Sequence, residues 1–145
     1  MSKSNDLENG ILGLIFNGTA IAGLATNHTS TPLTSLYVTL HTADPGEAGT
    51  QLTSETSYTS YARVAMTRPA TSVGGWTVSS NIVTPSSTIS FPACTGGSAV
   101  ITHMGIGSTS TGTGVLYYSG TVSPNISVAS GVTPQLTTST TITED

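Results

Sequence analysis

The chain has 145 residues, the size of one domain with a single hydrophobic core, and only 7% of these residues are charged. Because it has only three Lys and Arg residues and a net charge of −4, it lacks the basic patch needed to neutralise the phosphates of a nucleic acid. No run of the sequence approaches the roughly 18 apolar residues of a membrane-spanning helix. We therefore expect neither a nucleic acid nor a membrane as a partner.

Residues 5–17 are predicted to form a helix, because apolar side chains recur there at helical spacing. Asn5 and Glu8 are spaced as an N-cap and its N3 carboxylate, and Gly18 is suited to end the helix. The small residues of 19–32 indicate a linker. At this length the helix is marginal alone and needs a surface to pack on.

Beyond the linker, the sequence is typical of short β-strands. Apolar and polar residues alternate from residue 36, and the run ends at 43–49, where Pro45 and Gly46 suit the centre of a tight turn. Further strand candidates are separated by turns rich in Gly and Ser, and they are 61–68, 76–79, 82–84, 88–91, 99–107, 115–121, 126–128 and 135–143.

This pattern predicts an all-β fold, a two-sheet antiparallel sandwich of the jelly-roll or immunoglobulin-like type, with a short N-terminal helix. We expect residues 1–32 to form an N-terminal helix and linker arm, and residues 33–145 to form the β-sandwich domain. No internal repeat is apparent, which argues against a solenoid or a propeller.

The sequence gives no sign of catalytic chemistry. The three histidines are not spaced to converge with other ligands on a metal, and no serine nucleophile motif occurs. Asp44, Glu47 and Glu55 are the only carboxylates that could pair for glycoside hydrolysis, and we expect them to form a flexible, solvated acidic patch. Cys94 is expected to be a small buried hydrophobe. We predict no catalytic residue, no cofactor and no metal.

Two groups of residues are candidates for contacts between subunits. The first is the apolar stripe of the predicted helix, which needs burial but is separated from the β domain by the linker. The second is aromatic, and it includes two neighbouring tyrosines that face opposite ways on one strand, so that one of them can be offered to a partner. The candidates are Leu7, Ile11, Leu12, Ile15, Trp76, Tyr117 and Tyr118.

The run Leu36-Tyr-Val-Thr-Leu-His-Thr-Ala-Asp-Pro45 resembles a motif of a family of small bacteriophage virion structural proteins. The resemblance spans roughly residues 36–120 and continues in four later blocks, at 61–65, 89–93, 100–107 and 116–120. Members of this family are tail or tail-fibre proteins and head decoration or cement proteins. The resemblance therefore implies a virion structural protein, and it brings no catalytic or metal site with it.

The lack of repeats and of a coiled-coil segment favours a capsid decoration or cement protein that binds the outer face of the head. Its partners would then be the major capsid protein or other virion subunits, with self-association as a homo-oligomer. The alternatives are a tail or tail-fibre component and, further away, a carbohydrate-binding module or lytic enzyme. The N-terminal residues lack the features of a signal peptide, so we expect assembly into the virion in the host cytoplasm.

Overall fold

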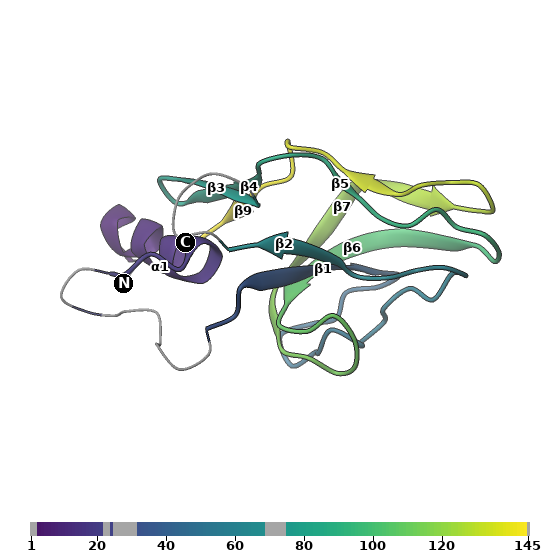
Figure 1. Ribbon diagram of the computed structural model, residues 1–145, viewed down its shortest axis with the longest axis horizontal. Coiled ribbons are helices and arrows are strands. Elements are labelled where there is room, and N and C mark those ends of the chain that lie inside the picture. Colours follow the sequence, from purple (N-terminus) through teal and green to yellow (C-terminus); the bar gives the residue numbers. More distant parts are fainter. Residues whose placement is uncertain (1–2, 22–23, 25–31, 69–74, 145) are drawn as a thin grey trace. The chain divides into compact units, whose positions relative to one another are not determined.

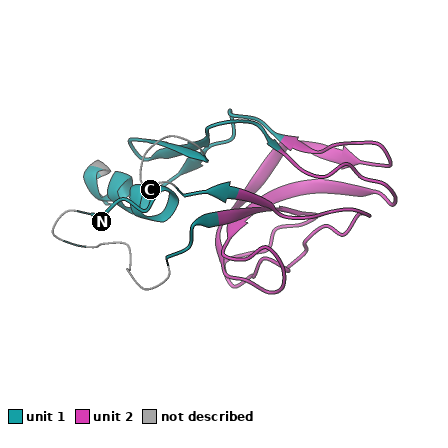
Figure 2. Cartoon of the chain, viewed as in Figure 1, with its two compact units in different colours: residues 1–35, 66–89, 136–145 teal, residues 36–65, 90–135 magenta. Residues whose placement is uncertain are grey.

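The computed structural model describes residues 3–21, 24, 32–68 and 75–144 (Figure 1). The chain is mostly β with one N-terminal helix, and the described strands form three small sheets, none of them closed into a barrel. The predicted all-β class with an N-terminal helix is therefore confirmed, whereas a two-sheet sandwich of the jelly-roll or immunoglobulin-like type stays a prediction. Figure 2 shows that the chain divides into two compact units, unit 1 (1–35, 66–89 and 136–145) and unit 2 (36–65 and 90–135).

The helix α1 (Asn5–Asn17) has the predicted bounds, but its N-cap is Ser4 and not Asn5. The Ser4 hydroxyl accepts from the N–H of Leu7 at 3.4 Å, which satisfies one of the free donors of the first turn. Gly18 ends the helix in the left-handed conformation, with φ 65°, as expected for a C-terminal glycine. The apolar residues Leu12 and Phe16 on this helix are fully buried.

Unit 1 buries the helix against a small antiparallel sheet of order β3-β4-β9, with β3 (Trp76–Ser79), β4 (Ile82–Pro85) and β9 (Ile142–Thr143). The rings of Phe16 and Trp76 meet edge to face, with their centroids 5.0 Å apart. The Arg68 side chain donates to the carbonyl oxygens of Leu14 and Ile15 in the last turn of α1. The division of the chain into an arm of residues 1–32 and a domain of residues 33–145 stays a prediction.

The largest sheet has the order β2-β1-β6-β7, with β2 (Val64–Thr67), β1 (Ser35–His41), β6 (Ala99–Gly107) and β7 (Leu116–Val128). β1 pairs antiparallel with β6 from Tyr37 opposite Gly107 to His41 opposite His103. Two short strands, β5 (Ile89–Ser90) and β8 (Gln135–Leu136), form the third sheet. The single strand expected over 135–143 is therefore divided into β8 and β9, and the strands expected over 115–121 and 126–128 are joined in β7.

The edge strand β7 follows β6 with two irregularities. Tyr118 lies opposite Ile106 and Leu116 opposite Gly107, so Tyr117 has no partner residue and forms a β-bulge. Further along, residues 122–125 of β7 lie opposite a single residue of β6, Thr102. The regularly paired stretch between the two irregularities is residues 118–121.

Candidate functional site: a groove beside the edge strand

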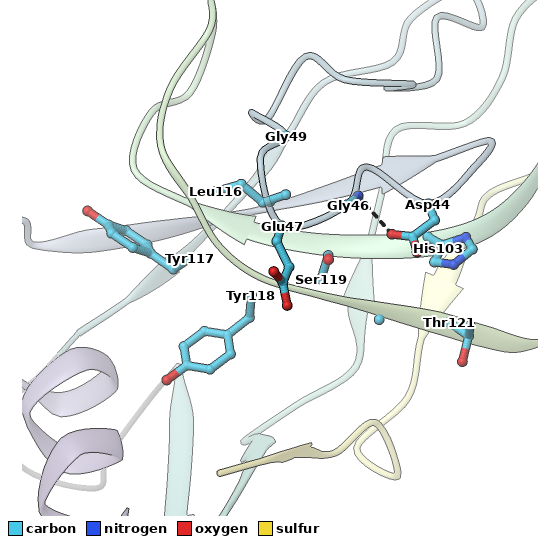
Figure 3. Close-up of a pocket in the computed structure, with 11 residues that line it drawn as sticks. Asp44, Gly46, Glu47, Gly49, His103, Leu116, Tyr117, Tyr118, Ser119 and Thr121 are labelled. Carbon is cyan, nitrogen blue, oxygen red and sulfur yellow. Dashed lines mark hydrogen bonds between the residues drawn. The ribbon is translucent and has the colours of Figure 1, made fainter. Parts of the chain in front are cut away.

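A groove of about 570 Å³ lies in unit 2 between the turn 44–49 and the first half of β7 (Figure 3). Six consecutive residues of β7, from Leu116 to Thr121, contribute to its lining. Successive side chains of a strand point to opposite faces of the sheet, and the lining also includes His103 of the neighbouring strand β6, so the groove extends from β7 over one face of the sheet.

The turn that forms the opposite wall is fixed by its own sequence. The Asp44 carboxylate accepts from the N–H of Gly46 at 2.9 Å, and Gly46 has a φ of 69° that favours glycine. The N–H of Gly49 donates back to the Gly46 carbonyl at 3.0 Å. A Cβ on Gly49 would lie 2.2 Å from the Pro45 carbonyl oxygen, so this position also requires glycine. The tight turn predicted at 43–49 is confirmed.

The chain itself places this turn beside the outer edge of β7. Val115, directly before β7, accepts from the N–H of Ser108 at 3.0 Å, which closes the connection from β6. Thr50 forms an antiparallel bridge with the same Val115, and so it occupies the other side of the strand. The turn 44–49 directly precedes Thr50, so the chain reaches the start of β7 from this turn, and residues of the turn and of β7 line the groove together.

The groove has an acidic wall. Asp44 and Glu47 are exposed, and neither forms an ion pair within the part of the chain that the structure describes. His103, which also lines the groove, lies on β6 directly opposite Thr121, and its Nδ1 is 2.8 Å from the hydroxyl of Thr102. In Figure 3 the Glu47 side chain reaches toward β7 near Ser119.

The third carboxylate of this region has a different role from the expected one. Glu55 does not belong to a solvated patch, because it forms a bidentate ion pair with Arg63, with two N–O distances of 2.8 Å and side chains that are 9% and 3% exposed. The Tyr61 hydroxyl also donates to Glu55 at 2.9 Å, and burial raises the pKa of this tyrosine. The hydrogen bond to Glu55 is the main cause that raises the pKa of Arg63.

This ion pair also holds the connection between β6 and β7. Arg63 donates to the carbonyl oxygens of Thr109 at 3.0 Å and Gly112 at 2.7 Å. The fully buried Gln51 also binds this connection through the backbone of Thr109. Its Oε1 accepts from the N–H of Thr109 at 3.0 Å, and its Nε2 donates to the Thr109 carbonyl at 3.2 Å. Residues of 51–63 thus fix the start of β7, and with it one end of the groove.

His41 at the end of β1 is a buried structural histidine and not a surface residue. Its Nδ1 lies 2.8 Å from the Thr53 carbonyl, which can only accept, so Nδ1 carries a proton. Its Nε2 lies 2.7 Å from the hydroxyl of Thr39, which can donate to it. Burial lowers the pKa of His41, which favours the neutral ring in this arrangement.

The residues predicted to contact other subunits are distributed over both units. Leu12 and Trp76 are fully buried inside unit 1, whereas Leu7, Ile11 and Ile15 keep some exposed surface on α1. In unit 2, Tyr117 is 43% exposed and lines the groove together with the less exposed Tyr118. The interface role of all seven stays a prediction, and in this conformation Leu12 and Trp76 have no surface to offer a partner.

Several important residues were not found by the sequence reasoning. The ring of Phe16 packs edge to face against Trp76, yet Phe16 lies outside the selected stripe. The pairing of Glu55 with Arg63 and the binding of Arg68 to the helix carbonyls join positions that no sequence motif relates. The scarcity of charge was the one signal in the sequence that could have indicated these contacts, because an isolated charged residue in a nearly uncharged segment often has a specific partner.

Within the described residues, no three His, Cys, Asp or Glu side chains are gathered closely enough to hold a metal ion. The same residues include no helix that has the length and apolarity needed to cross a membrane. What unit 2 offers instead is an open groove with a strand edge on one side. This arrangement is suited to holding another molecule.

The fold and the groove thus define a β-rich structural protein that presents a sheet edge. The protein family described as podophage GP4 fiber I protein gp80 matches residues 2–143, and the chain belongs to this family of phage fibre proteins. A comparison with curated proteins finds no match.

Membership of this family corrects the prediction from the sequence. The chain is a component of a phage tail fibre, so the expectation of a capsid decoration or cement protein that binds the head is wrong, and the tail-fibre alternative is the better one. The expectations of a non-enzymatic structural protein and of a place in the virion are confirmed by the family. As a fibre protein it associates with other virion subunits.

Proposed function

We propose that this chain is a small structural subunit of the fibre that associates with itself and with other fibre subunits mainly through apolar, hydroxyl and backbone contacts. The observation that carries the proposal is the family match over residues 2–143, nearly the whole chain. This match supports a role in fibre assembly for nearly all of these residues.

The distribution of charge supports the same mode of association. Only five formal charges lie between Gly10 and Thr143. Glu55 and Arg63 neutralise each other, and the Arg68 guanidinium is bound to backbone carbonyls at the end of α1. Asp44 and Glu47 are the two that remain at the surface. Exposed ion pairs contribute at most about 1 kcal/mol each, so most of the affinity must come from other contacts.

Labelling in the particle tests the location. Virions that carry an epitope tag on this chain are decorated with antibody and imaged by electron microscopy. We expect label on the fibres and not on the head shell, and label confined to the head would refute the proposal.

Self-association is tested separately by light scattering of the purified chain in low salt and in about 1 M salt, where the Debye length is only about 3 Å. We expect an oligomer in both conditions, and a monomer at every concentration would refute this part.

A further inference from the structure

The loop of residues 108–114 connects β6 with β7 in unit 2, and buried side chains hold it although its tip is exposed. Arg63 donates to the carbonyl oxygens of Thr109 and Gly112. Gln51, which is fully buried, binds both the N–H and the carbonyl of Thr109. Much of the buried polar chemistry of unit 2 therefore serves to order a loop that lies at the surface.

Two exposed apolar side chains lie at the base of this loop. Val115 directly follows the loop and is 58% exposed. Leu52 is 51% exposed and directly follows Gln51, whose N–H donates to the carbonyl of Thr113 at 3.1 Å. We call the loop 108–114 together with Leu52 and Val115 the loop patch. Water-exposed side chains of this size gain free energy when another surface covers them.

The loop patch carries no charged side chain, because residues 69–143 and position 52 include no Lys, Arg, Asp or Glu. A charged partner would therefore find no opposite charge on it. Two copies of this chain, each with a net charge of −4, repel one another and associate best where neither presents a carboxylate. Apolar groups match themselves, and so do the hydroxyls of the loop, since a hydroxyl both donates and accepts. The chemistry of the loop patch thus suits contact with a second copy of itself.

We propose that two copies of this chain associate through the loop patch, in a two-fold contact that brings Val115 and Leu52 of one copy against the loop patch of the other. This inference rests on the proposed function, because it names the surface used for self-association. Arg63 and Gln51 act as positioning residues, since a loop that is ordered before binding loses less conformational entropy on association.

The experiment measures the dissociation constant of self-association by sedimentation velocity of the purified chain. Val115→Lys places a cation at the base of the loop in both copies, where the two cations would repel. Its matched control is Val100→Lys, because Val100 is 52% exposed, lies toward the opposite end of β6 and gives the same change of net charge. We expect self-association at least tenfold weaker for Val115→Lys and less than a twofold change for Val100→Lys. Both variants should melt like the parent chain, and Leu52→Lys should weaken association in the same direction as Val115→Lys.

Amide hydrogen exchange gives an independent readout, because it should slow at residues 110–113 when the parent chain associates. A parent chain that stays monomeric at every concentration would contradict the self-association in the proposed function. Association of Val115→Lys and Leu52→Lys as strong as that of the parent would refute only the loop patch, and so would an equal loss in Val100→Lys. Slower exchange at 110–113 only after addition of phage particles produced without this chain would show that a different subunit covers the loop patch, and would refute the second copy.

Discussion

Replacement of Arg63 by Met should strongly destabilise unit 2. The substitution keeps the apolar part of the side chain but leaves the Glu55 carboxylate, 9% exposed, without a cation. Removing one partner of a buried ion pair costs about 3–5 kcal/mol. The carbonyl oxygens of Thr109 and Gly112 also lose a charged donor, but Gly112 is exposed and water can replace it. We therefore expect a loss of about 4 kcal/mol in the free energy of unfolding.

At about 3 °C for each kcal/mol in a chain of this size, this loss lowers the melting temperature by about 12 °C. Calorimetry measures the temperature, and urea unfolding followed by circular dichroism measures the free energy. Glu47→Gln, which removes an exposed carboxylate, is the control and should change stability by less than about 0.5 kcal/mol. The double variant of Arg63→Met with Glu55→Gln should recover part of the loss, because no charge is left buried. A loss below about 1 kcal/mol for Arg63→Met, the value of an exposed pair, would refute the reasoning.

Three other predictions concern His41, Leu12 and Arg68. Burial lowers the pKa of His41 below its usual value near 6.5, so the unfolded chain takes up a proton more readily than the folded chain. The free energy of unfolding should therefore fall as the pH drops from 7.5 to 5.5. Urea unfolding should show this pH dependence in the control variant His103→Gln and not in His41→Gln. Leu12→Ala should lower the free energy of unfolding by about 2–5 kcal/mol, because the Leu12 side chain is fully buried. Ile11→Ala should lower it clearly less, because the Ile11 side chain is partly exposed, and equal losses in thermal unfolding would contradict the burial of this face of α1. Arg68→Met should speed amide exchange in the last turn of α1, and unchanged exchange would show that its carbonyl bonds are dispensable.

Local signals in the sequence predicted the elements that local chemistry determines. The helix over 5–17 follows from apolar spacing and from Gly18, and the turn after β1 follows from Asp44, Pro45 and Gly46. Each of these features depends on residues within a few positions of one another, so the sequence contains the whole cause. The cap at Ser4 in place of Asn5 is an error of one residue, which is the usual precision at helix ends.

Long-range partners could not be predicted in the same way. Arg63 reaches Gly112 across 49 positions, and Arg68 reaches Leu14 across 54. Which residues meet at such distances depends on sheet register, and the bulge at Tyr117 shows that the register of β6 and β7 changes within one strand. The position of the groove depends on this register too, which is why the sequence could name Tyr117 but not the site around it.

The choice between head and tail failed for a related reason. The absence of repeats and of a coiled coil was used as evidence against a fibre, but a fibre can contain small domains that have neither. Composition constrains how a protein can bind, not where in the particle it binds.

The scarcity of charge has different consequences inside and at the surface of unit 2. Inside, the ion pair of Glu55 with Arg63 satisfies the carbonyl groups of a turn that the sheet leaves without strand partners. At the surface, a chain with so few charges cannot protect an edge strand with lysines, which is a common natural solution. The bulge at Tyr117 and the irregular stretch at 122–125 protect it geometrically instead, since they interrupt the edge on both sides of residues 118–121. An edge interrupted in this way offers no long regular stretch for the strands of other chains to pair with, so that backbone geometry gives the protection that other proteins obtain from charge.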